Sequence, residues 1–371
     1  MEIPLLQLTI QAREARARRG TLRMRAGVID TPAFMPVGTQ ATVKGLTPEE
    51  VWATGAQIIL NNAYHLYLRP GVELIEEMGG LHRFQAWDGG ILTDSGGYQI
   101  FSLASLHKIS EEGLLFRSHI DGSEHLMGPE KAISVQQRLG TDILMSFDQP
   151  VPWEATPAQA REATDRTHRW AARGKSAWNA ESGQALFGIV QGGFSEDLRR
   201  ESVQALVEIG FPGYSIGGLS VGEPKEMMWA MLDITTAALP DDCPRYLMGV
   251  GTPADLVRGV SLGVDMFDCV LPTRMGRNGT VFTWEGRLNL RNARFEHDAA
   301  PLDARCNCAV CHTFSRAYLR HLLKAGEILA VRSLSYHNLA FYQQLMTAMR
   351  QQISAGTFSE WAAEFFRTHV E

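Results

Sequence analysis

Three cysteines and a histidine near the end of the sequence could bind a metal ion. Cys306, Cys308 and Cys311 lie within six residues, and His337 follows 26 positions after the last of them. Three thiolates and one imidazole fill a closed tetrahedral zinc site and leave no position for water, which is typical of structural zinc. His312, directly after Cys311, is the alternative fourth ligand, although it would be strained there. The sequence therefore predicts one structural zinc ion per chain.

Three aspartates could take part in catalysis. Asp94, Asp148 and Asp268 each stand at or just after the end of a short apolar segment. Cleavage at the anomeric carbon of a sugar uses two carboxylates, one as the nucleophile and one to carry the proton. Asp94 and Asp148 could instead cap the helices that follow their strands. Asp268 is harder to explain by stability, because an apolar strand rarely ends in an acid for that purpose.

Glycine-rich turns and two further side chains accompany these aspartates. The glycine pairs at 96–97, 192–193 and 217–218 would let backbone N–H groups approach a flat ligand closely. A carboxylate can accept two N–H groups from one edge of a purine, and a glutamine amide or a backbone N–H can serve a carbonyl group. Tyr98 and Met248 could contact the two faces of the ring. These residue types indicate a purine site.

Eight short and nearly continuous apolar runs must position these residues. Such runs are typical of parallel strands buried on both faces, and amphipathic segments such as 129–139, 157–180 and 197–209 separate them. Eight strands alternating with helices predict an α/β fold, a (β/α)8 TIM barrel, in which catalytic groups lie at the C-terminal ends of the strands. An open doubly wound sheet is the alternative, but no G-x-G-x-x-G turn follows the first strand. The expected strands are 33–37, 57–60, 90–93, 142–147, 186–190, 214–217, 245–248 and 264–269.

The predicted organisation is a catalytic barrel followed by a smaller C-terminal part. Residues 1–271 should form the barrel, with a hairpin-rich insertion at about 102–127, and residues 272–371 should hold a basic segment, the zinc-binding subdomain and C-terminal helices. The net charge of −6 gives no global signal for a nucleic-acid partner, so such a partner would have to meet a local basic patch. That patch comprises Arg274, Arg277, Arg287, Arg291 and Arg294.

The cellular setting is predicted from the cysteines and from the hydropathy pattern. Cys243 and Cys269 stand alone, which is typical of a reducing compartment rather than of a disulfide framework. The arginine-containing N-terminal segment is not followed by an apolar run, so we expect no cleavable signal. No apolar stretch approaches the length that spans a bilayer. We therefore expect a cytoplasmic protein without a membrane partner.

Eight motifs, spread in order over most of the chain, resemble those of the bacterial tRNA-guanine transglycosylases, also called queuine tRNA-ribosyltransferases. The resemblance extends from about Pro32 to Tyr342. The motifs are DSGGYQ (94–99), VQGG (190–193), GGLSVGE (217–223), YLMGVGTP (246–253), MFDCVLPTR (266–274), GRNG (276–279), CNCAVC (306–311) and YHN (336–338).

The resemblance implies an exchange of bases in RNA, in the biosynthesis of queuosine. Guanine at the wobble position of the tRNAs for aspartate, asparagine, histidine and tyrosine is replaced by a 7-deazaguanine, without cleavage of the backbone. By this resemblance Asp268 is the nucleophile that forms a covalent link to the ribose, and Asp94 is the general acid/base. The resemblance implies no redox cofactor and no ATP. It also implies a homodimer that binds the anticodon loop of the tRNA.

The resemblance also implies two sets of binding residues. The base would be bound by Asp94, Ser95, Gly96, Gly97, Tyr98, Asp148, Gln191, Gly217, Gly218, Leu219 and Met248. The RNA would be bound by Gly249, Val250, Gly251, Thr252, Pro253, Ala254, Asp255, Thr273, Arg274, Met275, Gly276 and Arg277.

The chain departs from the bacterial pattern beside the purine site. Most bacterial members continue after the fourth-strand Asp with Glu-Cys-Thr-Pro, whereas this chain has Gln149-Pro150-Val151-Pro152. Eukaryotic relatives, which take the bulkier queuine, also lack that Cys but have Gly where this chain has Val221. The retained loop 219–223 favours the smaller 7-aminomethyl-7-deazaguanine as the incoming base, with queuine as the alternative.

Two other functions are alternatives to this one. A TIM-barrel glycosidase would use the same carboxylate pair, but the chain lacks an aromatic-rich sugar cleft. A non-catalytic tRNA-binding subunit should lose the nucleophile or the base, whereas this chain keeps Asp94, Asp148 and Asp268.

Overall fold

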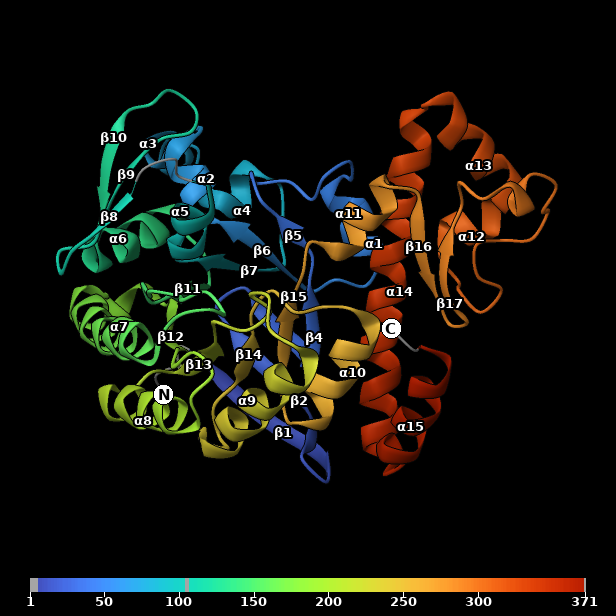
Figure 1. Cartoon of the computed structure of the whole chain (residues 1–371). Coiled ribbons are helices and arrows are strands. Elements are labelled where there is room, and N and C mark those ends of the chain that lie inside the picture. The colour runs from blue at the N-terminus through green and yellow to red at the C-terminus, as the bar shows by residue number, and fades with distance from the viewer. Residues whose placement is uncertain (1–5, 104–106, 370–371) are drawn as a thin grey trace.

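The computed structural model describes residues 6–103 and 107–369, and its centre is a parallel sheet surrounded by helices (Figure 1). In sheet order the strands are β4 (Ala33–Met35), β15 (Met266–Asp268), β14 (Arg245–Leu247), β13 (Gly213–Ile216), β12 (Ala185–Val190), β11 (Ile143–Met145), β7 (Gly90–Asp94), β6 (Ile58–Asn62) and β5 (Val37–Gly38). The first and last of these are separated in the chain by Pro36 alone, so the sheet returns to its start and forms a barrel. The predicted α/β barrel is confirmed.

The first predicted strand is divided because proline has no N–H group to donate to a sheet. The carbonyl of Pro36 still accepts a hydrogen bond from the N–H of Leu60, at 3.0 Å, which keeps the two halves in register with β6. The other predicted strands each overlap one observed strand, with ends that differ by a few residues. The apolar runs therefore located every strand of the barrel.

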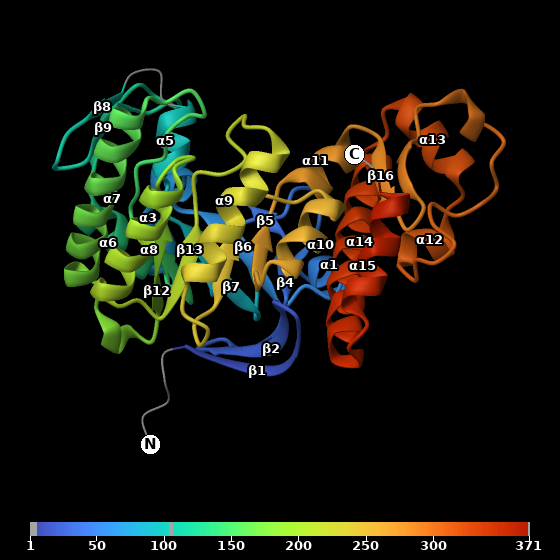
Figure 2. The ribbon, with the colours of Figure 1, turned by 60° about the horizontal axis from the view of Figure 1, so that its bottom comes forward.

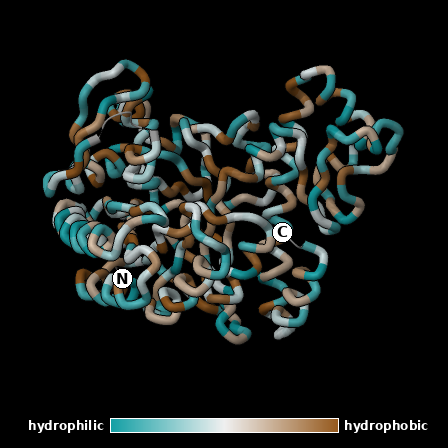
Figure 3. Tube along the Cα trace, viewed as in Figure 1, coloured by the Kyte–Doolittle hydropathy of each residue, from teal (hydrophilic) through white to brown (hydrophobic). Residues whose placement is uncertain are grey.

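The helices that follow the strands pack around the barrel (Figure 2). Their starts follow local rules: Thr252 caps α10, its side chain accepts the N–H of Asp255, and Pro253 occupies the first turn. Figure 3 shows hydrophobic residues along the central strands and a mostly hydrophilic α7 at the edge. The helices up to the eighth strand are α1 (Pro48–Ala53), α2 (Ala63–Leu68), α3 (Val72–Glu77), α4 (Gly80–Phe84), α5 (Gly97–Leu103), α6 (Pro129–Leu139), α7 (Pro157–Ala177), η1 (Ala180–Ser182), α8 (Glu196–Ile209), α9 (Lys225–Ala238) and α10 (Pro253–Ser261).

An antiparallel sheet that the sequence analysis did not predict covers the N-terminal end of the barrel (Figure 2). It consists of β1 (Gln7–Glu14), β2 (Ala17–Met24) and β3 (Gly27–Thr31). Frequent arginines obscured its alternation of apolar and polar residues, and one of them, Arg18, is fully buried. We call this end of the barrel the floor.

A second antiparallel sheet lies within the segment predicted as a hairpin-rich insertion. Its order is β10 (Glu124–Met127), β9 (Leu114–Arg117) and β8 (His107–Ile109). The chain reverses at two turns, where the N–H of Ser110 donates to the carbonyl of Gly113 and the N–H of Gly122 donates to the carbonyl of Ser118. Residues 104–106 of the predicted insertion lie outside the described residues.

A long helix, α14 (Ile328–Ala355), attaches the C-terminal part to the barrel (Figure 1). Its Gln343 amide donates to the carbonyl of Phe34 on β4, at 3.0 Å, and the hydroxyl of Tyr342 donates to Gly251, at 2.6 Å. The remaining elements are α11 (Leu271–Arg277), β16 (Thr280–Thr283), β17 (Gly286–Asn289), η2 (Ala293–Phe295), α12 (Ala309–Thr313), α13 (Arg316–Ala325) and α15 (Phe358–Thr368).

Candidate active site and metal centre

A cavity of about 410 Å³ opens at the C-terminal ends of the barrel strands. We call this end of the barrel the mouth. Ten of the eleven predicted base-binding residues line the cavity, together with Asp268. The exception is Gly97, which stands behind Asp148, since a Cβ there would lie 3.0 Å from the Asp148 carbonyl oxygen. Strands far apart in the sequence thus bring the predicted residues to one place.

Asp268 ends β15 and is held by two donors. Its Oδ1 accepts hydrogen bonds from the Tyr246 hydroxyl, at 2.6 Å, and from the Gly249 N–H, at 2.7 Å. Burial raises the pKa of Asp268, and these two hydrogen bonds oppose that rise. Because both bonds go to one oxygen, Oδ2 keeps its lone pairs for the cavity. This arrangement suits a carboxylate that attacks a carbon atom.

Asp94 is a buried acid at the mouth whose pKa is raised. It accepts hydrogen bonds from the side chain of Asn62 and from the Ala63 N–H, the latter at 3.1 Å. Burial raises the pKa of Asp94 to about 8, the charges of Asp268 and Asp148 add to this rise, and bonds from backbone N–H groups oppose it. At neutral pH the group is therefore mostly protonated, as a general acid requires.

Asp94 could also have capped the helix that follows its own strand, β7. It does not cap that helix, because its carboxylate accepts the Ala63 N–H at the start of α2, the helix that follows β6. Asn62 is the N-cap of α2, because its side chain accepts the N–H of His65 at 3.1 Å. Asp94 can therefore support a neighbouring helix while it faces the cavity.

Asp148 and Gln191 form a polar pair inside the cavity. The Gln191 Nε2 donates to Asp148 Oδ2 at 2.7 Å, and the Ser95 hydroxyl donates to Oδ1 at 3.3 Å. Burial raises the pKa of Asp148 to about 6. The Oε1 atom of Gln191 is buried and has no hydrogen-bond partner within the part of the chain that the structure describes. Because Asp148 lines the cavity, its carboxylate can accept N–H groups from a ligand.

The predicted stacking residues differ in exposure. Tyr98 is 54% exposed and Met248 is half-buried, and both line the cavity. Three other residues at the mouth had no predicted role: Tyr246 and Asn62 looked like ordinary strand residues, and Arg199 like an ordinary helix residue. Glu223 belongs to the GGLSVGE motif, and its carboxylate accepts the N–H groups of Ser220 and Val221.

The residues predicted to bind RNA fall into two groups. Gly249 and Arg274 line the cavity, and Thr252, Ala254, Met275 and Arg277 are at least partly exposed beside it. The side chains of the other predicted residues are buried or absent, so their positions can offer RNA only their backbone. The buried positions are Val250, Gly251, Pro253, Asp255, Thr273 and Gly276.

The basic patch extends from the mouth onto the C-terminal part. Arg274 and Arg277 belong to α11, and Arg287, Arg291 and Arg294 are exposed on and after β17. α11 packs closely on α14, since a Cβ at Gly276 would lie 2.6 Å from the Ser335 nitrogen. The position of these arginines therefore depends on α14.

The predicted metal ligands meet in one cluster. One ligand atom from each of Cys306, Cys308, Cys311 and His337 lies within 4.8 Å of the others, so the group could hold a metal ion. His337 sits in the middle of α14, and its Nε2 lies 2.9 Å from the carbonyl of Phe282. That contact directs Nδ1 to the sulfurs, 3.3 Å from Cys311. His312 is exposed and is not part of the cluster.

The fold and the mouth define the class of the protein. A closed α/β barrel that gathers carboxylates suited to cleavage at an anomeric carbon is typical of an enzyme of glycosyl transfer. The family model described as queuine tRNA-ribosyltransferase matches residues 13–371. The chain therefore belongs to the queuine tRNA-ribosyltransferase family, which is a family of pentosyltransferases, and the resemblance seen in the motifs is confirmed.

Individual relatives agree with the family match. A queuine tRNA-ribosyltransferase of Zymomonas mobilis is 57% identical over 366 residues, which cover 98% of this chain and 95% of the relative. One from Symbiobacterium thermophilum is 59% identical over 349 residues, or 94% of this chain and 87% of the relative. No helix within residues 6–103 and 107–369 has both the length and the apolar content needed to cross a membrane.

Proposed function

We propose that this chain is a tRNA-guanine transglycosylase that exchanges the wobble guanine of the tRNAs for aspartate, asparagine, histidine and tyrosine for a 7-deazaguanine in queuosine biosynthesis. The observation that carries this proposal is the arrangement of the acids at the mouth. Asp268 is held through one oxygen, Asp94 has a pKa of about 8, and Asp148 lies beside the unpartnered Gln191 oxygen. These are a nucleophile, a proton carrier and a site for a purine edge.

The reaction follows from these positions in two balanced steps. Asp268 attacks C1′ of the ribose, the bond from C1′ to the guanine nitrogen breaks, and protonated Asp94 supplies a proton to the departing guanine. In the second step the new base attacks C1′, the bond to Asp268 breaks, and Asp94 takes the proton that the new base loses. The covalent link keeps the RNA on the enzyme while one base leaves and another enters.

Exchange of radiolabelled guanine into unmodified tRNA tests the proposal. The wild-type protein should incorporate label, and denaturing gels should show a protein–RNA adduct. Asp94→Asn should slow both the departure of guanine and the entry of the new base. A protein that binds the tRNA without incorporating label would instead be a non-catalytic subunit, and one that hydrolyses oligosaccharides would be a glycosidase.

For the incoming base we propose 7-aminomethyl-7-deazaguanine. Pro150 and Val221 both line the cavity, while Gln149 turns away and accepts a hydrogen bond from Arg166 at 2.6 Å. The Glu223 carboxylate lies against the loop that carries Val221, where its charge favours an ammonium group. Parallel incorporation assays decide the matter, because a higher kcat/KM for queuine would contradict this assignment.

We propose that the ion of the metal cluster is zinc and that its role is structural. Three sulfurs and one imidazole nitrogen leave no open position, and the cluster includes none of the acids of the mouth. Cys306→Ala and His337→Ala should lower the folded yield and the zinc content together, as measured by elemental analysis. Full zinc content in the His337 variant would point to His312.

We also propose that the protein is a cytoplasmic homodimer and that one dimer binds the anticodon loop of one tRNA. Analytical ultracentrifugation with and without tRNA would give the stoichiometry, and a monomer that binds tRNA with full activity would contradict the dimer.

A further inference from the structure

Arg199 of α8 is a buried arginine that reaches the wall of the base cavity. Its side chain has no exposed surface, and all of its hydrogen bonds go to backbone carbonyl groups. Nε donates to Gly193 at 2.9 Å, Nη1 donates to Gly217 at 2.8 Å and to Val190 at 3.4 Å, and Nη2 donates to Gly218 at 3.3 Å. One guanidinium therefore joins the loops that follow β12 and β13.

A buried arginine without an ion-pair partner is costly, so its presence calls for a reason. Within the described residues no carboxylate lies within ion-pairing distance of Arg199. Burial lowers the pKa of Arg199 to about 10, and the charge of Glu223 opposes this only in part. Arg18 on the floor, by contrast, is equally buried but donates to both oxygens of Asp265.

The two carbonyls nearest the cavity show what Arg199 does there. A trans peptide is planar, so the N–H of one residue points away from the carbonyl of the residue before it. Because Arg199 holds the carbonyls of Gly217 and Gly218, the N–H groups of Gly218 and Leu219 must point to the opposite side. Gly218 and Leu219 both line the cavity.

The same turn also fixes Gln191. A Cβ at Gly218 would lie 2.3 Å from Gln191 Oε1, and a Cβ at Gly217 would lie 2.8 Å from Nε2, so the amide packs directly on the turn. Gly218 has a φ of +65°, a conformation that a residue with a side chain rarely adopts. A shift of the turn would therefore displace both the N–H donors and the amide that contacts Asp148.

We propose that Arg199 is a positioning residue for base selectivity, which directs the N–H groups of Gly218 and Leu219 at the C6 oxygen of a guanine-type base. This inference rests on the proposed function. Arg199 would not contact the substrate. It would instead hold the Gly217-Gly218 turn in one of the orientations that the turn can adopt.

Competition assays with guanine and 6-thioguanine test the inference, because these bases differ only at the atom that the N–H groups would contact. Arg199→Lys keeps the charge but loses the planar fork that bridges the carbonyls. We expect it to weaken inhibition by guanine about tenfold, the loss expected for one misdirected hydrogen bond, and inhibition by 6-thioguanine less than about threefold. An equal loss for both bases would show a merely structural role and overturn the proposal.

Arg245→Lys is the control at the opposite end of the barrel. Arg245 is buried at the floor, where it donates to the carbonyl groups of Leu239 and Pro240, at 2.9 Å and 3.2 Å, and to the carboxylate of Asp241, at 2.9 Å. This variant should lower the melting temperature without changing the ratio of the two inhibition constants.

The wild-type protein provides a test that does not depend on folding of the variants. If it exchanges guanine but binds guanine and 6-thioguanine equally tightly, no N–H group recognises the C6 oxygen and the inference about Arg199 is wrong. If the wild-type protein exchanges no guanine at all, the proposed function itself has failed.

Discussion

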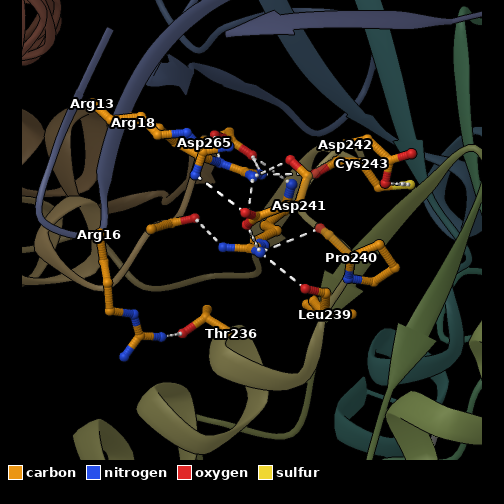
Figure 4. A network of polar contacts seen from close by, with 12 residues as sticks. Arg13, Arg16, Arg18, Thr236, Leu239, Pro240, Asp241, Asp242, Cys243 and Asp265 are labelled. Atoms are coloured by element: carbon orange, nitrogen blue, oxygen red, sulfur yellow. Dashed lines mark hydrogen bonds and ion pairs between the residues drawn. The ribbon is translucent and has the colours of Figure 1, made fainter.

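The floor and the mouth of the barrel both carry buried aspartates, but the three that line the cavity, Asp94, Asp148 and Asp268, lack among the described residues the cations that the floor supplies. Asp265 precedes β15, and its two oxygens accept hydrogen bonds from Arg18, with Nε at 2.8 Å (Figure 4). Arg18 also donates to the carbonyls of Asp241 and Cys243. Asp268, three residues further along at the other end of the strand, accepts hydrogen bonds from a hydroxyl and a backbone N–H, and no cation in the described part of the chain pairs with it.

The same contrast appears on the neighbouring strands. Asp142, just before β11, accepts hydrogen bonds from His82 at 3.0 Å, from Arg25 at 3.3 Å and from the Ile91 N–H at 2.8 Å. In residues 6–103 and 107–369, no ion pair reaches Asp94 or Asp148 at the mouth. Without a cation, burial raises the pKa of these acids. Pairing thus serves stability at the floor, and its absence at the mouth leaves Asp94 and Asp148 with raised pKa values.

The largest expected effect separates two aspartates of one strand segment. Asp268→Asn removes the proposed nucleophile, so kcat for guanine exchange should fall by at least about 10³-fold and the adduct with RNA should disappear. Binding of tRNA should be nearly unchanged. Persistence of the adduct in this variant would mean that Asp94 or another acid attacks the ribose.

Asp265→Asn should have the opposite profile. It leaves the Arg18 guanidinium buried without its counter-ion, which typically costs about 3–5 kcal/mol of folding free energy. Denaturant unfolding should therefore show a large loss of stability, while kcat of the remaining folded enzyme stays close to that of the wild type. A fall in kcat without a loss of stability would contradict the assignment of the floor aspartates to stability and of the mouth aspartates to catalysis.

Asp94→Asn should make the protein more stable at high pH. The folded protein holds a proton on Asp94 up to about pH 8, whereas an unfolded aspartate releases it near pH 4, so the free energy of unfolding falls across this interval. The substitution should raise stability by about 1–3 kcal/mol at pH 8 and have little effect at pH 4. Urea titrations at both values test this, and a variant destabilised equally at both would contradict it.

His82 at the floor should give the smallest effect. Burial alone would lower the pKa of His82, but its hydrogen bond to Asp142 and the charge of that group outweigh burial and raise it. The stabilising contribution is complete below the unfolded pKa of about 6.5 and is lost as the pH rises through the folded value. His82→Gln should therefore cost about 0.5–1 kcal/mol at pH 6 and almost nothing at pH 9. Equal losses at both values would show that the imidazole charge is irrelevant.

Local patterns in the sequence were enough to locate the barrel and most of the mouth. A strand buried on both faces is apolar throughout, so the runs ending near Asp94, Asp148 and Asp268 were recognisable one by one. Parallel strands in a barrel place all their C-terminal ends on one side, so the meeting of these acids followed from the fold class. The spacing of Cys306, Cys308 and Cys311 predicted the cluster because nearby thiols can share one ion.

Only the tertiary structure decided which charges are paired. Arg18 and Arg199 both stand in polar segments of the sequence. In the structure Arg18 pairs with Asp265, 247 residues away, whereas Arg199 donates to the carbonyl groups of the Gly217-Gly218 turn. The N-terminal sheet escaped prediction because it is rich in arginines, of which Arg18 is buried by partners that the local sequence does not contain. Hydrophobic periodicity is a property of neighbouring residues, whereas the pKa of a buried acid depends on groups that folding brings from elsewhere. For this reason the sequence by itself determined where the acids stand, and the tertiary structure determined which of them remain free to react.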